Sequence, residues 1–104
     1  MVTAAKVDRI DVLLRGVLAA LEDLPEILED QRRGALDHVE RDVLSMEWDN
    51  DAWHLHAVLD PAYRAGQMTP AQAERYRALL TRLREALPVI DQLGFARPRV
   101  PPDA

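Results

Sequence analysis

Apolar residues recur at steps of three and four along most of the chain, and this spacing predicts helices rather than strands. The first segment covers about residues 3–21, and charged residues fall mostly between its apolar positions. Its apolar stripe consists of Val7, Ile10, Leu14, Val17, Leu18 and Leu21. We therefore expect an amphipathic helix here, with one face turned towards a core.

A second segment opens just before Pro25, which suits the first turn of a helix because its missing N–H is not needed there. A polar run at residues 29–33 and Gly34 interrupt its apolar face. The apolar positions on either side are Ile27, Leu28, Leu36, Val39, Val43 and Met46. The preferred interpretation is one helix over residues 25–47 with a polar middle. The alternative is two shorter helices separated at Gly34.

Acidic and amide side chains at residues 49–51 form a cluster of the kind that caps a helix start, because they accept from free N–H groups. We expect a short helix from about Asp51 to Leu59. After Asp60–Pro61, one or two further turns should follow and end near Gly66.

The clearest helix signal lies at residues 69–93. Thr69 and Gln72 form a capping box, with Pro70 at the first helical position. The apolar residues that follow hold heptad spacing, which is typical of a helical bundle or an antiparallel coiled coil. They are Ala73, Tyr76, Leu80, Leu83, Leu87 and Ile90, flanked by Leu79, Ala86 and Leu93. Pro88 should kink this helix, and Gly94 should end it.

These elements predict an all-α fold, a small bundle of four to five helices that occupies residues 1–94. Residues 95–104 contain three prolines and no periodicity, so we expect an extended Pro-rich C-terminal tail. Phe95 and Val100 are the residues that could attach the tail to the bundle.

Composition narrows the classes of function. The chain has no cysteine, which excludes disulfides, thiolate metal sites and a cysteine nucleophile. No apolar run is long enough to span a bilayer and no signal-peptide pattern opens the chain, so we expect a cytoplasmic protein without membrane contact. No phosphate loop, nucleophile triad or dinucleotide motif is present, so no cofactor is predicted and catalysis is not favoured.

The net charge of −5 is unevenly distributed. Residues 1–60 hold fourteen acidic and six basic residues, whereas residues 61–104 hold four acidic and seven basic ones. The acidic front and the basic back could attract each other within one bundle or between two copies.

Our main functional interpretation is a non-catalytic interaction protein that forms a homo-oligomer or binds a protein partner. The apolar stripe of residues 73–93 is wide enough to exceed what one short chain covers. The predicted interface residues are Tyr76, Leu79, Leu80, Leu83, Leu87 and Ile90. Trp48 and Trp53 are either interface anchors or residues that close the core.

A first alternative is association with nucleic acid. The main cationic surface is the helix that carries Arg75, Arg77, Arg82 and Arg84. In addition, Arg33 and His38 resemble the Arg-x4–6-His motif of the HEPN ribonucleases, a family of small helical proteins. The resemblance covers six residues and implies RNA cleavage at a dimer cleft, with the arginine holding phosphate and the histidine transferring a proton.

A second alternative is a metal site in the bundle. Asp51 and His54 are three residues apart on a predicted helix and therefore share a face, with Glu47 one turn earlier. Carboxylates and imidazoles at this spacing can bind iron, manganese or zinc when facing helices complete the ligand set.

Overall fold

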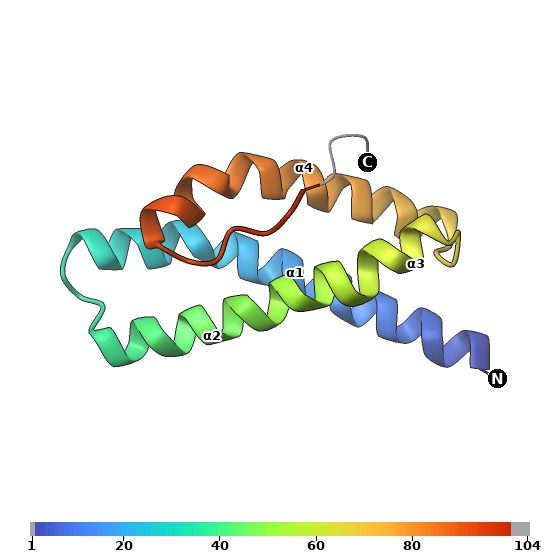
Figure 1. Cartoon of the computed structure of the whole chain (residues 1–104), viewed down its shortest axis with the longest axis horizontal. Helices are drawn as coiled ribbons and strands as arrows, with labels where there is room; N and C mark the ends of the chain where they lie inside the picture. Colours follow the sequence, from blue (N-terminus) through green and yellow to red (C-terminus); the bar gives the residue numbers. More distant parts are fainter. Residues whose placement is uncertain (1, 101–104) are drawn as a thin grey trace.

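The computed structural model describes residues 2–100, with side chains described from residue 9 onward. Within that range the regular structure is entirely helical and there is no strand, which confirms the predicted all-α class. Its elements are α1 (Val2–Arg32), α2 (His38–His54), the π-helical η1 (Leu55–Leu59), α3 (Asp60–Arg64) and α4 (Pro70–Leu93). Because α2, η1 and α3 follow one another without a break, the bundle consists of three rods rather than four or five helices (Figure 1).

The first rod ends at Gly34, so the preferred single helix over residues 25–47 is wrong and the break at this glycine is the correct alternative. Gly34 has a φ of 70°, in the left-handed region that glycine adopts without steric cost. The Ala35 N–H donates to the Asp30 carbonyl at 2.9 Å, and the Gly34 N–H donates to Gln31 at 3.1 Å. This pair of bonds is the Schellman motif, which closes a helix end.

The predicted boundary at Pro25 is also wrong, because α1 passes through this proline. Pro25 cannot donate to the carbonyl of Leu21, and in isolation it would favour a helix start. Packing overrides this local preference, since the ring lies on the exposed side of α1. The buried residues on the opposite side of α1 are Ile10, Leu14, Val17, Leu21, Leu24 and Leu28.

The second rod is continuous through residues 48–51, where a helix start was predicted. Trp48 is buried on its inner face, and Asp49 is exposed while Asp51 is partly buried, so the acidic residues lie along the helix instead of capping a new one. The π turn lies directly before Pro61, and the Asp60 N–H there donates to the Leu55 carbonyl. A wider turn at this point accommodates a proline that has no N–H for the carbonyl four residues back.

The third rod agrees closely with its prediction. Thr69 and Gln72 form the capping box, with Pro70 at the first position, and Gly94 ends the helix at a φ of 74°. Pro88 lies inside α4 without ending it. Ile90 and Leu93, beyond the proline, are fully buried, so the apolar stripe continues across it as predicted.

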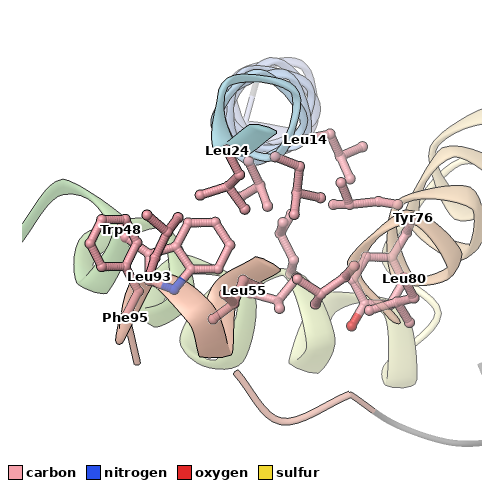
Figure 2. Packing of buried hydrophobic residues seen from close by; sticks show 14 of the residues in the cluster. Leu14, Leu24, Trp48, Leu55, Tyr76, Leu80, Leu93 and Phe95 are labelled. Atoms are coloured by element: carbon pink, nitrogen blue, oxygen red, sulfur yellow. The ribbon is translucent and has the colours of Figure 1, made fainter. Parts of the chain in front are cut away.

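A single core lies between the three rods. In Figure 2, Leu14 and Leu24 point from α1 towards Leu55 of η1 and Leu80 of α4. Trp48 closes one end of this core beside Leu93 and Phe95.

Residues 95–100 have no helix and run back along the second rod (Figure 1). Phe95 is buried and Val100 packs against the core, which agrees with the attachment expected from the sequence. The Trp48 indole N–H donates to the Ala96 carbonyl at 2.7 Å, and the Arg99 N–H donates to His56 Nε2 at 3.0 Å. Residues 101–104 of the predicted tail lie outside the described residues.

Candidate functional site

The six residues predicted as an interface are covered by the chain itself. The side chains of Tyr76, Leu79, Leu80, Leu83 and Ile90 are buried, and Leu87 is partly buried. They pack against α1 and the second rod, and they belong to the single core. In the folded chain the apolar stripe of α4 is therefore used mainly for the chain's own core, and its role as an interface stays a prediction.

The apolar surface that remains open lies on α2. Most of the large apolar residues with well-exposed side chains are on this helix, and they share one face because they are separated by four, three and seven residues. They are Val39 (60% exposed), Val43 (49%), Met46 (69%) and Trp53 (59%). We call these four residues, together with Asn50 in the same row, the α2 seam.

The α2 seam has the spacing of a helix-pairing surface. In heptad notation Val39, Met46 and Trp53 occupy d positions, while Val43 and Asn50 occupy a positions. The row spans two heptads, about 21 Å at 1.5 Å per residue. A single polar Asn at an a position is a device by which paired helices fix their register.

The opposite face of α2 explains why the seam is left open. Leu44 and Trp48 point into the bundle, and Leu55 and Leu59 continue this inner face along η1. Because α2 has two apolar faces and only one of them packs on the chain's own core, the other meets solvent. Sequence reasoning placed Val39, Val43 and Met46 on a stripe towards the core, and the structure corrects this assignment.

Carboxylates flank the α2 seam on both sides. Glu40 and Glu47 occupy e positions, while Asp42 and Asp49 occupy g positions, and all four are exposed. The Glu40 N–H donates to the capping side chain of Asp37 at 2.9 Å, which lowers the pKa of that carboxyl. The proximity of Asp37 in turn raises the pKa of Glu40. The seam is therefore an apolar strip inside a negative border.

A second open surface is a groove between α1 and α4. Its volume is about 610 Å³, and Leu14, Leu18, Ala78 and Leu79 provide its apolar lining. Its polar lining is Asp11, Arg15, Arg75 and Arg82. We call it the α1/α4 groove.

Asp11 joins the two walls of the α1/α4 groove. It lies 3.5 Å from the guanidinium of Arg75 and accepts from the Gln72 side chain at 3.0 Å. One carboxylate faces three guanidinium groups, so the rim has a net positive charge. Its sign is opposite to that of the α2 seam.

A polar cavity of about 700 Å³ lies between the second rod and residues 97–100. The buried Tyr76 hydroxyl donates to Asp60 at 2.9 Å, and Asp60 also accepts from Arg64 at 2.8 Å. Burial, and then the hydrogen bond to Asp60, raise the pKa of Tyr76 above its ordinary value. On the other side of the cavity, His56 Nε2 accepts a hydrogen bond from the Arg99 N–H. The Tyr76, Asp60 and His56 side chains of this cavity are therefore all hydrogen-bonded within the chain.

The metal-site alternative at Glu47, Asp51 and His54 gains no support from the arrangement of the described side chains. Among the described residues, no group of three or more His, Asp or Glu side chains is arranged to hold an ion. Glu47 and Asp51 do line a small cavity of about 60 Å³ between α1 and α2. Burial there, and then the neighbouring Glu47, raise the pKa of Asp51, whereas His54 opposes this shift.

The residues of the HEPN-like motif lie on either side of the turn between α1 and α2. Arg33 is exposed and forms an ion pair with Glu29 at 3.2 Å. His38 is exposed at the first position of α2. Neither residue lines one of the three cavities described above, and their catalytic role stays a prediction.

The four arginines of α4 do not form one uniform face. Arg75 and Arg82 line the α1/α4 groove, whereas Arg77 donates to the hydroxyl of Tyr63 at 3.4 Å, on the side of α3. Arg84 is half-buried. Their contact with nucleic acid stays a prediction.

Comparison of the chain with protein-family models, curated proteins and solved structures found no match. Within residues 2–100, none of the helices combines the length and the apolar character of a membrane span.

Proposed function

We propose that this protein is a non-catalytic helical interaction protein that docks onto another polypeptide through the α2 seam. The observation that carries the proposal is the exposure of four apolar side chains in one heptad row of one helix. Isolated apolar residues are common on protein surfaces and need no partner. A periodic set over two heptads is the arrangement that pairing between helices uses.

The chemistry of the seam also supports docking. Trp53 offers a large apolar surface with few rotatable bonds, a property of residues that dominate binding energy. Met46, the most exposed of the set, is flexible and adapts to the surface that it meets. The carboxylate border would exclude partners whose facing residues are acidic, and so would contribute specificity.

The test is site-specific photo-crosslinking in an extract of the cells that make the protein. A photoreactive residue replaces Met46 in one variant and Val12 in a matched control, since Val12 is also well exposed but lies on α1 outside the seam. We expect a defined polypeptide adduct from position 46 and none from position 12. The same adducts from both positions, or none from position 46, would contradict the proposal.

Substitution provides a second readout. Met46→Glu places a charge in the middle of the seam, whereas Val12→Glu places the same charge on another well-exposed site, on α1. Because both positions face solvent, we expect melting temperatures close to that of the parent protein. Only Met46→Glu should abolish the association that the crosslink reports.

A further inference from the structure

The border of the α2 seam restricts what can cover it. Glu40, Asp42, Glu47 and Asp49 occupy the e and g positions, which set the choice of partner in paired helices. Two α2 seams packed face to face would bring these carboxylates against one another, and like charges at such positions are repulsive. A matching surface is therefore apolar at its centre and basic at its edges.

The α1/α4 groove of the same protein has these properties. Leu18 and Ala78 line an apolar centre whose floor is the buried Leu14 and Leu79, while Arg15, Arg75 and Arg82 outnumber Asp11 on a rim of net positive charge. Residues 75–82 span about 10 Å of α4 at the helical rise, which corresponds to two turns, so the groove receives about half of the length of the α2 seam. A helix in this groove would lie against α1 and α4 together, in the helix-in-groove mode of recognition.

We propose that the α2 seam of one copy docks into the α1/α4 groove of a second copy. This inference rests on the proposed function and names the partner as the same chain. Charge complementarity carries it, because one molecule presents both an acid-bordered apolar row and an arginine-bordered apolar groove. The seam lies in the acidic front of the sequence, and two of the three arginines of the groove, Arg75 and Arg82, lie in its basic back.

Such a contact is heterologous, because it joins two different surfaces. Each bound pair still has one free seam and one free groove. Association therefore continues beyond the dimer, either to a closed ring or to an open chain, and it increases with protein concentration. A symmetric dimer built from two seams or from two grooves has no such continuation.

Two complementary variants test this arrangement. Met46→Glu blocks the seam and leaves the groove intact, whereas Ala78→Glu blocks the groove and leaves the seam intact. Both positions are exposed on helices, so both variants should fold. Each substitution should weaken association on the order of a hundredfold. Met46→Glu puts a charge into an apolar contact, whereas Ala78→Glu fills the groove with a larger side chain and neutralises part of the rim formed by Arg75 and Arg82.

Sedimentation of each variant alone should show monomers, and an equimolar mixture should show a one-to-one dimer that does not grow. The seam of the Ala78→Glu chain and the groove of the Met46→Glu chain remain available to each other in that mixture. A mixture that stays monomeric while the parent protein associates overturns the proposal. A parent protein that is monomeric at all concentrations overturns it as well.

Crosslinking identifies the surfaces in contact. The chain has no cysteine, so Met46→Cys and Ala78→Cys each introduce a unique thiol. With a short bismaleimide, the mixture should give the 46-to-78 product in excess of its random proportion. An excess of the 46-to-46 product indicates seam-to-seam pairing and overturns the proposal.

Failure of this inference is distinguishable from failure of the proposed function. If the complementary variants do not pair, but position 46 still crosslinks to a different polypeptide, the seam docks onto another protein and only the identity of the partner is wrong. If position 46 crosslinks to nothing, both are wrong.

Discussion

Replacing glycine by alanine should have opposite effects on stability at two positions of the first rod, Gly34 and Gly16. Gly34 has a φ of 70°, whereas Gly16 lies in the interior of α1, and a Cβ at residue 16 would meet no atom within 4 Å. We expect Gly34→Ala to lose about 1 kcal/mol of unfolding free energy, because alanine is strained in the left-handed region. Gly16→Ala should gain roughly 0.5–1 kcal/mol through its higher helix propensity. Urea unfolding measures both, and equal signs would contradict the assignment of the rod end.

The hydrogen bond from the Tyr76 hydroxyl to Asp60 gives a second prediction for a single residue. Its ring is fully buried beside Tyr63, with centroids 4.8 Å apart, and its hydroxyl donates to Asp60. Tyr76→Phe keeps the ring and removes this hydrogen bond, which should cost about 1 kcal/mol of unfolding free energy. Tyr63→Phe is the control, since its side chain is only half-buried, and it should cost less. An unchanged stability of Tyr76→Phe would show that the bond contributes nothing.

The carboxyl of Asp51 predicts a pH dependence. Burial raises its pKa, so the folded state holds the proton more tightly than the unfolded chain does. Stability therefore falls as pH rises from the ordinary value of 3.8 through the raised pKa, and the full loss applies at neutral pH. Asp51→Asn should gain up to about 0.5 kcal/mol at pH 7, allowing for solvent screening of a half-exposed group.

The gain from Asp51→Asn should disappear in acid below the ordinary pKa, where the aspartate is neutral in both states. Chemical unfolding at a series of pH values measures the difference between the two proteins. Asp49→Asn, on an exposed position of the same helix, is the control. A gain that is constant with pH would show that desolvation of the charge is not its cause.

Among the elements, α4 could be predicted most fully and the first two rods least. The capping box at Thr69 and the apolar heptads place α4 correctly, because local signals and packing agree. At Pro25 and at residues 49–51 the local signals and the packing disagree. Local chemistry favours a helix start at each place, but Leu24, Leu28 and Trp48 are buried there, and packing decides.

The candidate surface could not be predicted from the apolar pattern alone. The pattern shows that residues 39, 43 and 46 share a face, but it does not show which face another helix covers. A more specific signal was present on the same helix, where Leu44 and Trp48 form a second apolar face opposite the first. A helix with two apolar faces in a small bundle leaves one of them open to a partner.

The contrast between the α4 stripe and the α2 seam gives a prediction at the scale of elements. Leu83 is fully buried, so Leu83→Ala should lose about 2–5 kcal/mol of unfolding free energy through the cavity that it leaves. Val43 is 49% exposed, so Val43→Ala should change the stability of the monomer by less than about 1 kcal/mol and weaken association. Thermal unfolding of dilute protein separates the two effects. Similar losses for both would show that the seam is covered within one molecule.

At the scale of the whole molecule, the three rods leave two surfaces of opposite charge uncovered. The described part of the chain measures 48 × 28 × 18 Å, so no residue lies far from the surface. Docking between an acidic border and a basic rim should weaken as salt is added, because exposed charges are screened over about 8 Å at physiological ionic strength. Sedimentation from low to high salt measures this dependence. Association that strengthens with salt would instead indicate a contact dominated by apolar burial.

The most direct test of the docking surface is the rate at which hydroxyl radicals oxidise Met46. Mass spectrometry follows this rate in native protein within its own cell extract and in dilute purified protein. Met68, which packs against the core in the turn before α4, is the internal reference. If the α2 seam is covered by a partner, Met46 and Trp53 are oxidised several-fold more slowly in the extract while Met68 is unchanged. A ratio of the Met46 rate to the Met68 rate that is the same in the extract and in the purified protein would contradict docking at the α2 seam.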